Sequence, residues 1–137
     1  MSEAAAEQIR VPIERDGDVV TARQTGRALA ADLGFRGTDL TLIATAISEV
    51  ARNIVVYAQR GEIKVGTALD GPRRGITVVA HDDGPGIPDI ELAMRDGYST
   101  GKSLGLGLSG ARRLMDEFEI VSRVGVGTTI TMRKWTR

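Results

Sequence analysis

The sequence predicts a two-layer α+β sandwich in which three longer helices cover one face of a five-stranded sheet. Two observations predict this fold. Short β-branched runs come mostly in pairs separated by turn residues, a pattern typical of antiparallel hairpins. Three longer segments repeat apolar or small residues at helical spacing. The length of 137 residues is that of one domain, so we expect 1–137 to form a single unit with a loose terminus at 1–8.

One strand and two helices are expected in the first part of the chain. The strand alternates apolar and polar residues, and Pro12 favours a sheet edge because it has no N–H to donate. Gly34 is a natural stop for the first helix. The predicted elements are a strand at 9–13, a helix from Val19 to Leu33 with an N-cap in Asp16-Gly17-Asp18, and a helix from Thr38, whose hydroxyl can cap it, to about Tyr57.

Four strands and two further helices complete the predicted fold. The turns at 70–75 and 125–127 join the strands into two hairpins. Residues 95–103 are rich in glycine and small polar side chains without periodicity, so we expect this stretch to be mobile. The predicted strands are 61–69, 76–80, 118–122 and 128–135, and the helices are a short one at 89–94 and a longer one that opens at 105–110 and continues to Met115.

Composition excludes several classes of function. Eighteen basic residues balance eighteen acidic ones, so nothing favours nucleic acid as a partner. The chain has no cysteine and one histidine, His81, which we interpret as structural; thiol catalysis, zinc sites and a Ser-His-Asp triad are therefore not expected. We see no apolar run of membrane-spanning length and no signal-like start, and we expect a cytoplasmic protein without membrane contact.

The loop 82–88, Asp-Asp-Gly-Pro-Gly-Ile-Pro, follows a short apolar strand directly. Its glycines and prolines impose a sharp, rigid turn, and glycine lets a flat ligand approach the backbone. A carboxylate at a strand end suits the amino group of a purine base. The same residues are ordinary in a surface turn, so this stretch alone leaves both interpretations open.

The second helix carries an unusual polar pair beside its apolar stripe. Glu49 and Asn53 lie four residues apart, so their side chains project together. A lone Glu/Asn pair is more often a solvated helix flank. The stripe itself faces the predicted core and consists of Leu40, Ile43, Ile47, Val50 and Ile54.

Three glycine-rich interpretations compete near residue 105. Gly101-Lys102-Ser103 resembles the end of a Walker A loop, but Asp96 stands where that loop needs glycine, and no strand leads in. Gly105, Gly107 and Gly110 satisfy G-x-G-x-x-G, but they follow a loop rather than the first strand of a βαβ unit. We therefore interpret them as the hinge of a lid that ends at a helix N-terminus, where backbone N–H groups bind phosphate oxygens.

Taken together, these stretches resemble the GHKL ATPase/kinase family, which includes gyrase and the histidine kinases. Four motifs occur in the family's order: E-x-x-x-N at 49–53, D-x-G-x-G at 82–86, the lid-end glycine box at 103–108 and G-T at 127–128. The short chain and brief lid are similar to the small bacterial partner-switching serine/threonine kinases. The stretches that carry this closer similarity are 21–24, 46–54, 83–90, 96–100 and 113–118. The resemblance implies a Bergerat-type fold with a mixed, mostly antiparallel sheet and a short ATP lid.

The resemblance also implies roles for individual residues. Glu49 would orient or deprotonate the attacking hydroxyl, and Asn53 would hold Mg²⁺ that bridges the ATP phosphates. Asp82 would accept from the adenine amino group, supported by Thr128. The remaining ATP-binding positions would be Gly84, Gly86 and Ile87 around the base, and Lys102, Ser103, Gly105, Leu106 and Gly107 over the phosphates. The sequence departs from the family in two places. Asp83 stands where the family often has asparagine, and it would place an extra carboxylate near the metal. Leu108-Ser109-Gly110 follows the lid glycines, and we assign no effect to this difference.

The implied function is an ATP- and Mg²⁺-dependent serine/threonine protein kinase. It would phosphorylate scaffold or antagonist proteins of the STAS type and, when released, activate a PP2C-type phosphatase in a bacterial stress-response switch. The chemistry suits these residues, because phosphoryl transfer needs positioning and charge neutralisation more than covalent help. The alternative is an anti-sigma factor with kinase activity, which would share every nucleotide motif. A free-standing ATPase would need a longer lid and further domains.

Overall fold

The computed structural model describes residues 8–95 and 107–137. Predictions that fall on 1–7 or 96–106 lie outside these residues. The predicted α+β class and element order are confirmed. The elements are β1 (Gln8–Ile13), α1 (Asp16–Asp32), α2 (Thr38–Asn53), the π-helix η2 (Ile54–Ala58), β2 (Gly61–Asp70), β3 (Arg73–Asp82), α3 (Ile90–Ala93), α4 (Gly107–Leu114), β4 (Glu117–Arg123) and β5 (Gly127–Trp135).

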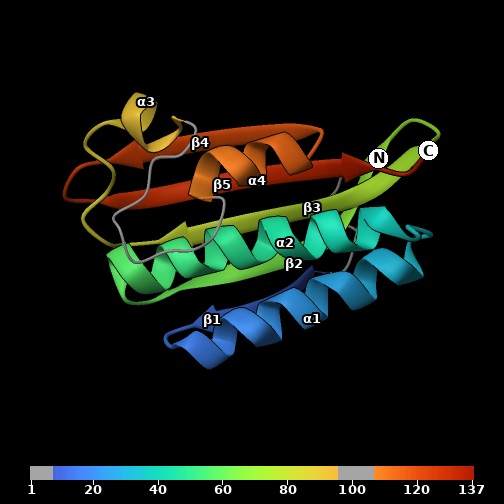
Figure 1. Ribbon diagram of the computed structural model, residues 1–137, viewed down its shortest axis with the longest axis horizontal. Helices are drawn as coiled ribbons and strands as arrows, with labels where there is room; N and C mark the ends of the chain where they lie inside the picture. Colours follow the sequence, from blue (N-terminus) through green and yellow to red (C-terminus); the bar gives the residue numbers. More distant parts are fainter. Residues whose placement is uncertain (1–7, 96–106) are drawn as a thin grey trace.

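The five strands form one sheet in the order β1-β2-β3-β5-β4. All four pairings are antiparallel, so the sheet is not mixed as the resemblance implied. Helices α1, α2 and α4 cover one face, and α2 lies between the other two (Figure 1). This arrangement confirms the two-layer sandwich.

The core lies between the helices and the alternate residues of the central strands. In α2 the predicted apolar stripe is buried except at Leu40, which is half-buried. Its residues pack onto strand positions that alternate with solvent-facing ones, as expected for a sheet covered on one side. The largest fully buried side chains include Ile43, Ile47, Val50 and Ile54 from the helical layer and Ile63, Val65, Ile76, Val78, Ile130 and Met132 from the sheet.

Both predicted helix N-caps were wrong, whereas Gly34 follows the end of α1 at φ 103° as predicted. Helix α1 has Arg15 as its N-cap; Asp18 lies inside the first turn, and its carboxylate accepts from the backbone N–H groups of Glu14 (2.8 Å) and Arg15 (3.2 Å). Helix α2 is preceded by Gly37 at φ 55°, and Thr38 is its first residue without a capping side chain. Glycine suffices there because it reaches a positive φ at little cost.

The end of α2 widens into the π-helix η2, which stops one residue after the predicted end. Local π turns are frequent at functional sites. Within the combined segment Thr38–Ala58, of 21 residues, a window of 18 residues has a mean hydropathy of 1.3, so by length and composition alone the segment could span a membrane, which the sequence analysis did not expect. Half of that window is buried inside the protein, as in the core helix of a globular fold.

Candidate functional site

Glu49 is a buried carboxylate between α2 and α4. It is 7% exposed, which rules out the solvated helix flank. Its Oε1 accepts from the backbone N–H of Gly107 (2.8 Å), and its Oε2 accepts from Nη1 of Arg52 (3.1 Å). The contact with Gly107 joins the predicted base to the end of the predicted lid, 58 residues further along the chain.

Asn53 is the last residue of α2 and is half-buried. Its side-chain amide makes no hydrogen bond within residues 8–95 and 107–137, so it is available to a ligand. Within residues 8–95 and 107–137, no group of three or more His, Cys, Asp or Glu side chains could hold a metal ion. Mg²⁺ prefers oxygen ligands and keeps several waters, and is commonly held by one or two protein groups plus substrate phosphates. A single amide oxygen therefore fits such an ion.

Asp82 ends β3 with its side chain on the helix-covered side of the sheet. It is 5% exposed, and its Oδ1 accepts from the backbone N–H of Gly84 (2.9 Å). No described residue donates to Oδ2. Thr128 is its register partner on β5 and is 4% exposed. The antiparallel pairing thus brings together two predicted base-binding residues that are 46 positions apart.

Ser122 belongs to this cluster, although sequence reasoning missed it. Its Oγ accepts from the backbone N–H of Ile87 (2.7 Å) and lies 2.7 Å from Oγ1 of Thr128. Ser122 therefore links the loop 82–88 to Thr128, the register partner of Asp82. Nothing in the sequence pointed to Ser122, because a serine in an alternating strand is unremarkable without the register of β4 and β5.

Two glycines of the loop are required by contacts within the protein. A Cβ on Gly84 would lie 2.6 Å from Cβ of Ala58 in the π-helix. Gly86 has φ 79°, and a Cβ there would lie 2.3 Å from the carbonyl oxygen of Arg123. The glycines were predicted to give a base room; the structure adds that they seat the loop between η2 and the β4–β5 hairpin.

The predicted phosphate-covering residues fall mostly outside the described part of the chain. Gly107 is the exception: it is the first residue of α4 and has φ 71°. Its N–H points at Glu49 in this structure. Lys102, Ser103, Gly105 and Leu106 lie outside the described residues, as does most of the stretch expected to be mobile.

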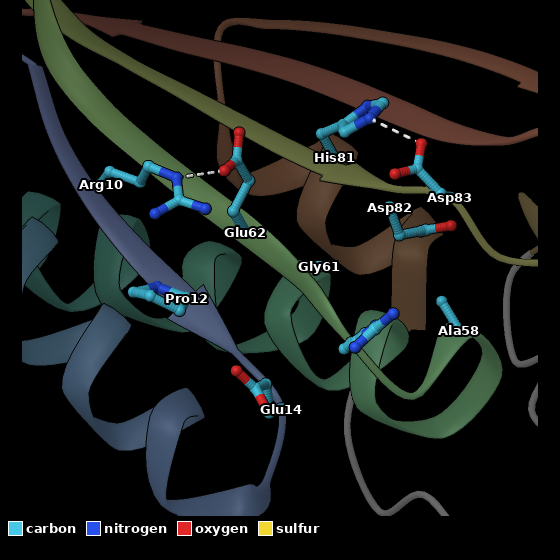
Figure 2. Close-up of a pocket in the computed structure, with 10 residues that line it drawn as sticks. Arg10, Pro12, Glu14, Ala58, Gly61, Glu62, His81, Asp82 and Asp83 are labelled. Atoms are coloured by element: carbon cyan, nitrogen blue, oxygen red, sulfur yellow. Dashed lines mark hydrogen bonds and ion pairs between the residues drawn. The ribbon is translucent and has the colours of Figure 1, made fainter.

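A hollow of about 390 Å³ lies beside the predicted site (Figure 2). Of the predicted site residues, only Asp82 lines it. Gly61, the register partner of Asp82, also lines it, whereas Arg10, Pro12, Glu62 and His81 alternate with core positions, so most of the sheet residues around the hollow face away from the helices. An ion pair between Arg10 and Glu62 and a hydrogen bond between His81 and Asp83 lie along its wall (Figure 2). The Arg10 guanidinium lowers the pKa of Glu62 by hydrogen bonding.

Asp83 does not lie at the place near the metal where it was predicted. Its Oδ1 lies 3.1 Å from Nε2 of His81, and its side chain is largely exposed. It was predicted to sit near the metal that Asn53 would hold; it instead faces His81 on the open side of the sheet. His81 also lies 2.8 Å from Oγ1 of Thr129 through Nδ1. These contacts suit the structural role predicted for this histidine.

Comparison with known proteins places the chain in a family. A family model described as a histidine kinase-like ATPase domain matches residues 12–134. The chain belongs to this family. The serine/threonine-protein kinase RsbT of Bacillus subtilis is 49% identical over 131 residues, covering 96% of this chain and 98% of the relative. The anti-sigma F factor of Caldanaerobacter subterraneus subsp. tengcongensis is 33% identical over 121 residues, covering 83% and 82%.

A solved structure supports the same fold. The crystal structure of the RsbU and RsbW domains of Rv1364c from Mycobacterium tuberculosis has a TM-score of 0.59 at 25% identity, over 93% of this chain and 31% of that chain. This chain is an RsbT-like serine/threonine kinase of the partner-switching kind with an ATP-binding domain. The predicted family, fold and class of enzyme are thereby confirmed, and the roles of single residues stay predictions.

Proposed function

We propose that this kinase transfers the γ-phosphoryl group of Mg-ATP to a serine or threonine of a STAS-domain protein. When released from that scaffold, it would bind and activate a PP2C-type phosphatase in a cytoplasmic stress-response switch of the stressosome kind. One observation carries the catalytic part: a buried carboxylate at Glu49 lies one turn from the amide of Asn53, which bonds to none of the described residues. The similarity to RsbT supports the choice of partners.

The nucleotide is proposed to lie over the helix-facing end of β3 and β5. Asp82 accepts a hydrogen bond from the purine amino group through Oδ2, to which no residue in the described part of the chain donates, and Thr128 supports this contact. Gly84, Gly86 and Ile87 form the wall of the base site. The phosphates reach the start of α4, where Gly107, together with Lys102, Ser103, Gly105 and Leu106, covers them.

Asn53 would hold Mg²⁺ through its amide oxygen, and the bound ion would neutralise charge on the phosphates. Glu49 accepts the proton of the substrate hydroxyl as the hydroxyl oxygen bonds to the γ-phosphorus. The bond from that phosphorus to the β–γ bridging oxygen breaks, and ADP leaves with the electron pair. A carboxylate is a workable base here if the hydroxyl comes within hydrogen-bond reach.

Two substitutions separate catalysis from binding. Glu49→Gln keeps the size and removes the base, so we expect transfer from labelled ATP to a STAS-domain protein to fall about 10²- to 10⁴-fold. Its affinity for a fluorescent ATP analogue should stay near that of the wild type.

Asp82→Asn should chiefly weaken the affinity for this ATP analogue, because an amide NH₂ would face the amino group of the base. Undiminished transfer by Glu49→Gln, or equal loss of affinity in both variants, would contradict the assignment.

The anti-sigma alternative has its own support in the similarity to anti-sigma F factors. The stronger and more complete similarity to RsbT favours the switch kinase. Affinity capture from cell extract, with and without ATP, decides between them. Recovery of a PP2C-type phosphatase and a STAS protein supports the proposal; recovery of a sigma factor overturns it. Rapid ATP turnover without any protein substrate would instead favour a free-standing ATPase.

A further inference from the structure

The carboxylate of Glu49 has two hydrogen-bond donors that come from different elements. Gly107 belongs to α4 and donates its backbone N–H to Oε1, whereas Arg52 belongs to the same helix as Glu49 and donates to Oε2. No other residue among those described bonds to this side chain. The two oxygens are thus held independently, one by each donor.

The proposed reaction breaks the contact with Gly107 and keeps the contact with Arg52. The N–H of Gly107 lies at the positive end of α4, the place where a phosphate oxygen is proposed to bind. A phosphate there takes this N–H and frees Oε1 to face the substrate hydroxyl. Arg52 is three residues from Glu49 on one helix, so its contact does not depend on the lid or on α4.

A buried carboxylate that loses its last partner is costly to keep in place. The Glu49 side chain is 6% exposed, so water replaces a lost partner poorly, whereas the Arg52 side chain is 41% exposed and keeps its hydration. We propose that Arg52 is a positioning residue for the proposed phosphoryl transfer: it holds Oε2 of Glu49 and thereby aims Oε1 at the substrate hydroxyl. This inference rests on the proposed function of Glu49.

A purely structural role would have a different signature. If Arg52 only stabilised its own helix through this i,i+3 pair, its loss would lower thermal stability and leave the transfer rate of the folded protein nearly unchanged. A positioning role instead lowers the transfer rate at saturating ATP while leaving nucleotide affinity alone. Lysine keeps the charge but not the planar fork of arginine, so it should restore part of the rate.

The test measures single-turnover transfer from labelled ATP to the STAS-domain protein that the wild-type kinase phosphorylates, with nucleotide affinity measured separately. Arg52→Ala should lower the saturating transfer rate about 10- to 100-fold, as expected for a lost hydrogen bond to a charged group. Arg52→Lys should recover a measurable part of this loss. Arg36→Ala removes the same kind of side chain before the start of α2 and should transfer like the wild type.

The outcomes distinguish this inference from the proposed function. If the wild type transfers phosphate and Glu49→Gln does not, but both Arg52 variants transfer normally, then Arg52 is not a positioning residue. A loss of rate that only follows a loss of nucleotide affinity overturns the inference as well. If Glu49→Gln transfers normally, the proposed function fails and the role of Arg52 falls with it. Should Arg52→Ala not fold, a normal rate in Arg52→Lys and in Arg52→Gln overturns the inference.

Discussion

At the scale of single residues, one hydroxyl joins two strands and a loop beside the proposed base site. Ser122 receives the N–H of Ile87 and lies within hydrogen-bond distance of Thr128. A hydroxyl can accept and donate at once, so it serves both neighbours. Because Thr128 pairs with Asp82 in register, Ser122 sets the position of residues on both sides of the proposed base.

Ser122→Ala tests this link. The change leaves the N–H of Ile87 without its partner and frees the Thr128 hydroxyl, so we expect nucleotide affinity to fall about 5- to 10-fold, equivalent to roughly 1 kcal/mol. Titration with a fluorescent ATP analogue measures it. Ser48→Ala is the matched control, because the Ser48 hydroxyl donates only to the carbonyl of Ala44 in its own helix. Equal affinity in both variants would show that Ser122 does not position the base site.

At the scale of elements, the loop 82–88 is clamped between the π-helix and the β4–β5 hairpin. Gly84 touches Ala58 on one side, and Gly86 lies against Arg123 on the other. The N–H of Gly125 also donates to the carbonyl of Pro85 (2.8 Å). The widened turn η2 and the hairpin tip therefore act together on the base site, although they are distant in the chain.

Gly86→Ala is expected to loosen this clamp. A residue with a Cβ costs about 1–2 kcal/mol at a positive φ, and the clash with the carbonyl of Arg123 adds about 1–3 kcal/mol. Gly71→Ala isolates the first cost, since Gly71 has φ 59° with nothing within 4 Å of its added Cβ. Chemical denaturation should therefore show the larger loss of unfolding free energy for Gly86→Ala. Equal losses would mean that the loop moves away from the hairpin freely.

At the scale of the whole molecule, the proposed site draws on both halves of the chain. Glu49 and Asn53 come from α2, Asp82 from β3, and Gly107 and Thr128 from α4 and β5. No single element forms the site by itself. A ligand that contacts all of these elements binds the folded state alone, and it should therefore stabilise the whole domain.

Mg-ATP at 100 times its dissociation constant should raise the unfolding free energy by about 2.7 kcal/mol. For a chain of this size that corresponds to an increase in Tm of roughly 10 °C. Chelation of Mg²⁺ should remove part of this shift, because Asn53 and the phosphates would lose the ion between them. Asn53→Ala should retain the metal-independent part and lose the rest. A Mg²⁺-dependent shift that survives in Asn53→Ala would place the ion elsewhere.

Much of the fold follows from the sequence because local patterns carry it. The apolar stripe of α2 is spaced for one helix face, and the paired β-branched runs alternate for a sheet covered on one side. The spacing from Glu49 to Asn53 and the glycines after Asp82 also indicate the type of site, since both patterns are short and local. The helix starts were less predictable, because Arg15 and Gly37 act through backbone conformation rather than through side-chain oxygens.

The sequence by itself determined the order of the elements and the family, and it predicted the residues of the proposed nucleotide site. Only the tertiary structure decided how those residues are held: Ser122 beside Thr128, Gly107 against Glu49, and Asp83 turned toward His81. Each of these contacts depends on strand register or on the packing of one element against another. A shift of one residue in register would move Ser122 to the other face of the sheet, and no local pattern specifies that choice.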